Sequence, residues 1–481
     1  MKKLKFDKKF LIGGAVAANQ IEGAYDIKNK GLSIADLRRY NSKLDRKNIN
    51  TERPMTKEKI MDALSFNPKF IYPKRFGIDF YYKYKEDIAL FGEMKMNVFR
   101  TSIAWTRIFP NGIEEKPNQD GLDFYKDIFE ECKKYNIEPL VTISHYETPY
   151  YLIKEYGGWK NKKLINLFIH FAKTVYSEYK EIVKYWMPFN EINAAIYSKW
   201  AGAGLMDDED NLTASVHQSM HNLFVANALA VKVGHEINSN FMIGCMIAGM
   251  QSYPITCKPE DVLATLKDQQ LKKYFFFDVM CKGYYPSYYK KYLKDQKIQV
   301  DATPEELEII KNNIVDYCGF SYYMSGTSGE QISKENEGNL ITMGKNPYLK
   351  STEWGWQIDP IGLKIMMHEL WDRYQLPLFI AENGIGVTEV LNDNNTVEDD
   401  YRIEYLKLHL QNILEAIDEG VNCFGYTMWT PIDIISHGTS EMSKRYGLIF
   451  VDQNDYCEGT KKRYKKKSFE WFKKFRETGY L

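Results

Sequence analysis

Eight short, mostly apolar segments recur along the chain, and they constrain its fold more than any other feature. They are residues 10–17, 98–103, 138–144, 185–189, 241–249, 316–322, 378–381 and 423–428. Segments with the periodicity of amphipathic helices lie between them, including residues 80–95, 122–135, 164–180, 214–236, 362–373 and 400–419. Apolar strands that alternate with helices are typical of a parallel sheet buried on both faces. Eight such units predict an α/β fold, the (β/α)8 barrel.

The length of 481 residues fits this barrel if its loops are enlarged, although about three smaller domains would also fit. No Pro/Ser-rich linker divides the chain, so residues 1–481 are expected to form a single catalytic barrel domain. Two segments, residues 37–75 and 325–357, exceed ordinary connections and follow predicted strands. Loops in this position build the active site of a barrel, so both predict extended βα loops around a site.

The charges of the chain balance, with 64 Lys and Arg against 64 Asp and Glu. A non-specific nucleic-acid binder needs an excess of clustered cations, so no nucleic-acid partner is expected. The basic run at residues 461–467 precedes an aromatic-rich terminal helix, and we interpret it as solvated surface.

The cysteines and the N-terminus indicate the compartment. Seven scattered cysteines without a C-x-x-C pair favour a reducing cytoplasm over a disulfide framework or a zinc knuckle. Residues 1–18 mimic a signal peptide, but Asp7 interrupts the basic part, and Gly13 and Gly14 break the apolar part. No stretch approaches the roughly 20 apolar residues of a membrane span. A soluble cytoplasmic protein without a membrane partner is therefore expected.

Polar and aromatic side chains stand at or just beyond the carboxyl ends of the predicted strands. They are Gln20, Arg100, His145, Asn190 with Glu191, Tyr323, Glu382 with Asn383, and Trp429. The carboxyl ends of barrel strands meet in one mouth, so these side chains are expected to converge. Amide, imidazole and carboxylate groups beside an aromatic platform suit a polyhydroxylated ligand.

Glu191 and Glu382 follow the fourth and seventh strands, which lie nearly opposite each other around a barrel mouth. Cleavage of a glycosidic bond with retention needs one carboxyl as acid and base and a second as nucleophile, about 5 to 5.5 Å apart. Repulsion within such a pair raises the pKa of one carboxyl, which then serves as the acid. Arg100 is the candidate counter-charge of the nucleophile, and Tyr323 its candidate hydrogen-bond donor. The alternative is two unrelated glutamates at helix starts.

Four segments resemble the signature segments of family 1 glycoside hydrolases, over nearly the whole chain. They are GGAVAANQIEGAY (13–25), FRTSIAWTRIFPNG (99–112), YWMPFNEIN (185–193) and FIAENGIG (379–386). The resemblance implies a cofactor-free retaining hydrolase with Glu191 as acid/base and Glu382 as nucleophile. It also implies sugar contacts from Gln20, His145 and Asn190, a stacking platform at Trp429, and Tyr323 as partner of the nucleophile.

The segment WTPIDIISHGTSEMSKRY (429–446) indicates a phosphorylated sugar. Family members that take free sugars typically carry a Glu where this chain has Ser436. At about 4 Å from a phosphate, that Glu would cost on the order of 4 kcal/mol per charge pair at an effective dielectric near 20. Ser436, Lys444 and Tyr446 instead supply a hydroxyl, an ammonium and a phenol. Their spacing resembles the phosphate loop of 6-phospho-β-glucosidases, as does STEWGWQIDP (351–360), where Trp354 or Trp356 lines the aglycone side.

His437 follows the serine, where these relatives have a small residue and phosphogalactosidases a Trp. The expected small-molecule partner is thus a phosphorylated β-glucoside, with a 6-phospho-β-galactoside or a free β-glucoside as rival substrates. A catalytically silent sugar-phosphate-binding protein is the non-enzyme alternative. No P-loop or dinucleotide fingerprint occurs, and Gln218 after His217 breaks a zinc-protease motif, so neither cofactor nor metal is expected. A homo-oligomer is left open.

Overall fold

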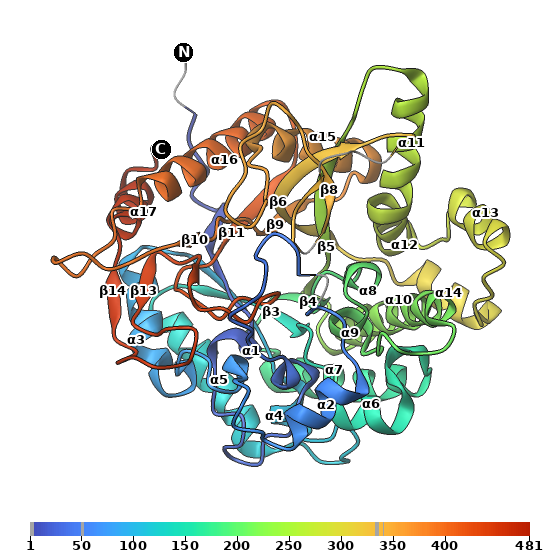
Figure 1. Ribbon diagram of the computed structural model, residues 1–481, viewed down its shortest axis with the longest axis horizontal. Helices are drawn as coiled ribbons and strands as arrows, with labels where there is room; N and C mark the ends of the chain where they lie inside the picture. The colour runs from blue at the N-terminus through green and yellow to red at the C-terminus, as the bar shows by residue number, and fades with distance from the viewer. Residues whose placement is uncertain (1–3, 50–51, 332–335, 340) are drawn as a thin grey trace.

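The computed structural model describes residues 4–49, 52–331, 336–339 and 341–481, and eight parallel strands within them close into a ring (Figure 1). They are β1 (Leu11–Ala15), β2 (Val98–Ser102), β3 (Glu138–Ser144), β4 (Tyr185–Phe189), β5 (Met242–Pro254), β6 (Tyr317–Ser328), β9 (Leu378–Glu382) and β11 (Cys423–Trp429). β1 pairs with both β11 and β2, and the pairing of β5 with β6 completes the ring. The eight predicted strands and the (β/α)8 barrel are confirmed.

Helices surround the strands on the outside of the ring (Figure 1). The principal ones are α3 (Phe80–Glu93), α5 (Gln119–Lys134), α7 (Lys163–Tyr179), α10 (Leu212–Ile237), α12 (Phe275–Lys282), α15 (Pro360–Tyr374), α16 (Asp400–Asp418) and α17 (Lys467–Thr478). The six helices predicted from periodicity are all present, and α5 shows the largest shift, starting at Gln119 instead of Leu122. None of the helices in the described ranges is long and apolar enough to cross a membrane.

Apolar side chains pack on both faces of the strands. An inner cluster fills the barrel with residues from several strands, namely Val98, Leu140, Met187, Met246, Tyr317, Phe379 and Ala381. Alternate residues such as Ile247 and Phe320 join the larger core that the strands share with the helices. This packing explains the apolar strand pattern, and it leaves the polar residues at the carboxyl ends to form the floor of the mouth.

β5 and β6 extend beyond their predicted ends. The apolar pattern did not reveal these extensions, because the outer halves of both strands carry polar residues. The apolar pattern ends near Gly249 and Tyr322, but the two strands stay paired up to Pro254 and Ser328. A register irregularity lies between Gly249 and Gln251, and the extension carries polar residues. The predicted loop 325–357 therefore begins within β6, and its residues 332–335 and 340 lie outside the described ranges.

Short elements occupy the connections between the barrel strands and their helices. The helices are α1 (Ala18–Ile21), η1 (Ile34–Leu37), α2 (Lys57–Leu64), η2 (Pro73–Arg75), α4 (Trp105–Ile108), α6 (Tyr150–Tyr156), η3 (Gly158–Lys160), α8 (Ala194–Tyr197), α9 (Lys199–Ala203), α11 (Pro259–Gln269), η4 (Gln270–Tyr274), α13 (Ser287–Asp295) and α14 (Pro304–Asn312). The strands are β7 (Asn336–Glu337), β8 (Met343–Gly344), β10 (Val387–Thr388), β12 (Lys444–Arg445), β13 (Ile449–Val451) and β14 (Arg463–Lys465). In the loop 37–75, of which residues 50 and 51 lie outside the described ranges, helix α2 buries Ile60 and Ala63 in a small core with Ile153 and Trp200, so the described part around α2 is folded onto the barrel.

The interpretation of residues 461–467 as solvated surface is wrong for part of the run. Lys466 is buried and pairs with Asp433 at 2.9 Å and with Glu389. Arg463 binds Asp87 through two nitrogens, each at 2.8 Å. The run contains β14, which pairs with β13, so its charges hold the C-terminal segment against the barrel.

Candidate active site

A cavity of about 970 Å³, counting its open mouth, lies at the carboxyl ends of the barrel strands. Ten of the side chains predicted from the sequence line it, namely Gln20, His145, Asn190, Glu191, Tyr323, Trp356, Glu382, Trp429, Ser436 and Tyr446. They come from segments distributed over the whole chain, so only the closed ring brings them together. Four others are buried but do not line the cavity, namely Arg100, Trp354, Asn383 and Lys444.

Glu382 ends β9 and is held by two donors. The Arg100 guanidinium lies 2.6 Å from Oε1, and the Tyr323 hydroxyl donates to Oε2 at 2.7 Å. Burial raises the pKa of the Glu382 carboxyl to about 7 and nearby Glu191 acts in the same direction, whereas Arg100 and Tyr323 act against both. The raised pKa falls on the expected nucleophile, because Glu382 is buried at a strand end. Arg100 and Tyr323 occupy the supporting positions predicted for them.

Glu191 follows β4 and is held by two hydroxyl groups. Tyr146 donates to its Oε2 and Ser321 to its Oε1, both at 2.5 Å. Ser321 is also the backbone partner of Glu382 in the pairing of β6 with β9. Ser321, which holds the Glu191 carboxylate, is therefore a neighbour of Glu382 in the sheet, and both glutamates line the same cavity.

The backbone turns sharply where Glu191 and Tyr146 leave their strands. Their φ angles are 36° and 60°, in the left-handed region that residues other than glycine rarely adopt. Such a conformation costs of order 1 kcal/mol or more and persists only where the surrounding structure imposes it. Here the turn directs both side chains toward the cavity, where they bond to each other.

Five cavity residues carry a buried polar atom that has no hydrogen-bond partner among the described residues. These atoms are Gln20 Oε1, His145 Nδ1, Asn190 Nδ2, the Tyr197 hydroxyl oxygen and His437 Nδ1. Arg100 donates to Asn190 Oδ1 at 2.6 Å, which turns the amide nitrogen of Asn190 away from the guanidinium. Buried polar atoms without partners are costly, so the cavity suits a ligand with several hydroxyl groups.

Ser436 and Tyr446 come together at one end of the cavity. The Gln20 amide donates to the Ile435 carbonyl at 2.7 Å and fixes the loop just before Ser436. Burial raises the pKa of the Tyr446 phenol far above its usual value, against a hydrogen bond with Ser436. Two neutral hydroxyls thus face this part of the cavity.

Lys444 lies immediately behind Trp356 and Tyr446. Its Nζ is 3.9 Å from the ring centre of Trp356 and 5.4 Å from that of Tyr446. Burial lowers the pKa of the Lys444 ammonium to about 7. A Cβ on Gly386 would lie 2.8 Å from two Lys444 side-chain carbons, so a glycine there makes room for the lysine. In the described part of the chain this ammonium has aromatic neighbours but no ion pair.

Trp356 lines the cavity, whereas Trp354 does not. A bridge between Ser351 and Gln357 folds this segment into a hairpin, in which Trp354 is fully buried and donates to Glu441 at 3.3 Å. Of the two tryptophans predicted for the aglycone side, the structure therefore places Trp356 on the wall. Its ring also contacts Tyr323, at 5.0 Å between ring centres.

Sequence reasoning missed the side chains that hold the loops. Arg46 lies 2.9 Å from Glu441 and neutralises the carboxylate that the phosphate-type loop itself contains. Lys74 donates to the His437 carbonyl at 2.9 Å. Both lie in loop 37–75, where the sequence shows no strand or helix periodicity from which the direction of a side chain could be predicted. Tyr146 and Ser321 were also missed, although the sequence holds a signal for both. Tyr146 directly follows the predicted site residue His145, and Ser321 lies two positions before the predicted site residue Tyr323.

We expect kcat/KM for a substrate of this site to fall as the pH decreases through about 7, because Glu382, the nucleophile expected from the sequence, could attack only when ionised. This fall is the acidic limb of the pH profile, and an ordinary glutamate would place it near pH 4.5. Replacing Tyr323 by phenylalanine removes a donor that stabilises the ionised form, so the limb should move to higher pH. In the control Tyr253→Phe, the lost hydroxyl bonds to Asp359 outside the cavity, and the limb should not move. A limb below pH 5 in the unmodified protein would contradict this view of Glu382.

Comparison with known proteins gives a consistent result over the whole chain. The sequence model of glycosyl hydrolase family 1 matches residues 2–480. The chain is 50% identical to aryl-phospho-β-D-glucosidase BglH of Bacillus subtilis (strain 168), over 97% of this chain and 96% of the relative. It is 48% identical to a 6-phospho-β-glucosidase of Clostridium longisporum, over 98% and 97%. The structure of a family 1 β-glucosidase from Thermotoga maritima superposes with a TM-score of 0.83 at 27% identity, covering 100% of both chains.

Proposed function

The chain belongs to glycosyl hydrolase family 1, and on this premise we propose that it is a retaining 6-phospho-β-glucosidase with Glu382 as nucleophile and Glu191 as acid/base. The observation that carries the proposal is that two differently held carboxylates, Glu191 and Glu382, line the same cavity as Ser436 and Tyr446.

The first step forms a covalent intermediate. The Glu382 carboxylate attacks the anomeric carbon, and Glu191 gives its proton to the glycosidic oxygen as the C–O bond breaks. The aglycone leaves as an alcohol, and the sugar is bound to Glu382 as an ester. Arg100 and Tyr323 fix both oxygens of the nucleophile before it attacks.

The second step releases the sugar with retained configuration. Glu191, now a carboxylate, takes a proton from a water molecule, and the water oxygen attacks the anomeric carbon while the bond to Glu382 breaks. Tyr146 and Ser321 hold Glu191 through hydroxyl groups, which both donate and accept hydrogen bonds. They therefore support Glu191 in its protonated and its ionised form.

The phosphate end of the site is assigned to Ser436, Tyr446 and Lys444. The two hydroxyls line the cavity, and the lysine reaches the phosphate by turning its flexible side chain from behind Trp356. Its ammonium has no ion pair within the described ranges to give up when it turns, and it gains a charge-assisted bond. The ion pair of Arg46 with Glu441 supports the same assignment, because it removes a negative charge from the loop that receives the anion.

The preference for a glucoside over a galactoside is supported by the names of the relatives, since both are phospho-β-glucosidases. His437 lines the cavity and contacts the Tyr146 ring at 4.7 Å between ring centres. Its Nδ1 has no partner among the described residues, so the imidazole is free to bond a sugar hydroxyl. We assign the His437 imidazole to the 4-hydroxyl of the sugar.

We also propose that the enzyme works in the cytoplasm, where sugars that are phosphorylated during uptake arrive. Residues 1–481 are proposed to act as one catalytic unit.

Turnover of three nitrophenyl β-glycosides tests the proposed substrate. We expect kcat/KM to be highest for the glucoside 6-phosphate, lower for the galactoside 6-phosphate and lowest for the free glucoside. Loss of the phosphate should cost roughly a hundredfold or more, because a charge-assisted contact is lost. A preference for the free glucoside would contradict the phosphate assignment, and binding without turnover of any of the three would indicate a silent sugar-phosphate-binding protein.

A further inference from the structure

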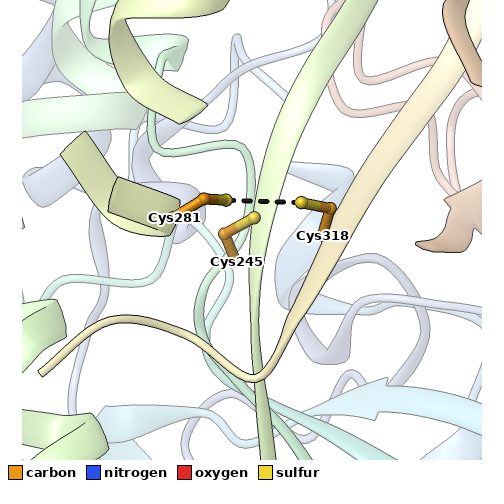
Figure 2. Close-up of side chains that lie close together, drawn as sticks. All are labelled: Cys245, Cys281 and Cys318. Carbon is orange, nitrogen blue, oxygen red and sulfur yellow. Dashed lines mark hydrogen bonds between the residues drawn. The ribbon is translucent and has the colours of Figure 1, made fainter. Parts of the chain in front are cut away.

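Three buried cysteines meet outside the barrel wall, away from the cavity (Figure 2). Cys245 on β5 and Cys318 on β6 are partners in the strand pairing, and Cys281 comes from α12. Their neighbours Met246 and Tyr317 point into the barrel, so the two strand cysteines face the helix layer. The three sulfur atoms lie within 4.8 Å of one another. Residues far apart in the sequence thus place three thiols at one point.

The three sulfurs are held only weakly in this arrangement. Cys281 and Cys318 share a contact of 3.3 Å between their sulfurs, much longer than the roughly 2.05 Å of a disulfide. The Cys245 thiol donates to the Tyr317 and Gly319 carbonyls at 3.8 and 3.7 Å. All seven cysteines are free thiols. Thiols are weak donors, so little is lost if these contacts are exchanged for metal–sulfur bonds.

We propose that Cys245, Cys281 and Cys318 form a binding site for a soft, thiophilic metal ion, and the donor set selects Cu(I). Hard ions such as Mg²⁺ and Ca²⁺ need oxygen ligands, and this site offers sulfur. Structural zinc sites and iron–sulfur clusters need four ligands. Within the described residues, no histidine or carboxylate joins the three thiols. Cu(I) is soft and accepts three sulfur ligands, which matches what the site contains.

Binding at this site exchanges protons and transfers no electrons. Copper enters and remains as Cu(I), and each thiol that coordinates as a thiolate releases its proton to the solvent. One thiolate already neutralises the single charge of the ion, which suits a buried site where a net charge would be costly. Because protons are released, the affinity for Cu(I) should rise with pH.

The bound ion would join two strands to a helix of the outer layer. β5 and β6 are already joined by their strand pairing, whereas α12 contacts them here through apolar packing and the weak contact between Cys281 and Cys318. An ion that binds the folded chain more tightly than the unfolded one raises its thermal stability. None of the three cysteines lines the cavity, so hydrolysis should be little affected.

The test is an anaerobic titration of the full chain with Cu(I), in competition with a coloured Cu(I) chelator and followed until the absorbance is constant. Cys257 is exposed and Cys457 partly exposed, so both are replaced by serine in every sample. We expect one Cu(I) per chain and a higher Tm. Cys245→Ala, Cys281→Ala and Cys318→Ala should each weaken binding at least tenfold. The matched controls Cys132→Ala and Cys423→Ala remove a buried thiol outside the site and should bind like the parent.

Several results would overturn the proposal. These are less than one equivalent of Cu(I) in the parent, an unchanged Tm, or equal weakening in the controls. Hydrolysis of nitrophenyl glucoside 6-phosphate reports whether each variant is folded. A variant that loses hydrolysis is replaced by its serine counterpart, which keeps the size of the side chain but offers no soft ligand, and the same loss of binding is expected.

Discussion

Replacing Glu382 by glutamine is expected to lower kcat/KM for nitrophenyl glucoside 6-phosphate by on the order of 10⁴-fold or more. The amide keeps the shape of the side chain but cannot form the glycosyl ester. It also places a neutral group opposite Arg100, which lies 2.6 Å from the carboxylate in the unmodified protein. Steady-state hydrolysis measures the loss, and binding of a non-hydrolysable phosphorylated sugar shows that the site is intact.

Glu147 offers a matched control for this substitution. It is also buried at the end of β3, but it does not line the cavity. Burial raises the pKa of its carboxyl to about 8, so at neutral pH it is largely protonated, and glutamine resembles that form. Glu147→Gln should therefore keep most of the activity. A Glu382→Gln protein that retains more than a tenth of the parent activity would show that another group is the nucleophile.

Replacing Lys444 by alanine is expected to lower kcat/KM roughly a hundredfold or more for the phosphorylated glucoside and to change it little for the free glucoside. Lys444 is buried in the loop assigned to phosphate, and its Nζ lies 5.4 Å from the ring centre of Tyr446. Its ammonium packs between Trp354, Trp356 and Tyr446, so alanine also leaves a space there. Hydrolysis of the two substrates by the same preparation measures the ratio.

Two further substitutions separate the charge of Lys444 from its packing. Lys444→Met keeps most of the volume without the charge and should show the same selective loss. Lys444→Arg keeps the charge. Burial lowers the pKa of Lys444 to about 7, so the free enzyme loses this charge as the pH rises above 7, and kcat/KM for the phosphorylated substrate should decline. An arginine stays charged, so the Lys444→Arg protein should show no decline of kcat/KM for the phosphorylated substrate above pH 7. Equal losses on both substrates in the methionine variant would contradict a phosphate role.

The sequence predicted the part of the molecule that repeats. Buried strands carry a continuous apolar pattern, and their carboxyl ends must meet once the ring closes. Arg100, Tyr323 and Glu382 were therefore expected to lie together, and their hydrogen bonds are present. The roles assigned to Glu191 and Glu382 stay predictions.

The sequence predicted much less of the loops, because contacts there do not follow a period. Arg46 reaches Glu441 across 395 positions, and nothing in the spacing of either residue signals the pair. The distinction between Trp354 and Trp356 depends on a hairpin turn, and the burial of Lys466 depends on two acids from other segments. Cys245, Cys281 and Cys318 are likewise unremarkable in the sequence and meet only in the folded barrel.

The most direct test of the proposed reaction is covalent trapping. A 2-deoxy-2-fluoro-β-glucoside 6-phosphate with a good leaving group should form the ester of the first step and hydrolyse slowly, because fluorine destabilises both transition states. Peptide mass spectrometry should find one sugar phosphate per chain, attached to Glu382, and far slower labelling by the reagent without phosphate. Labelling of any other residue, or equally fast labelling by the unphosphorylated reagent, would contradict the proposed nucleophile or the proposed substrate.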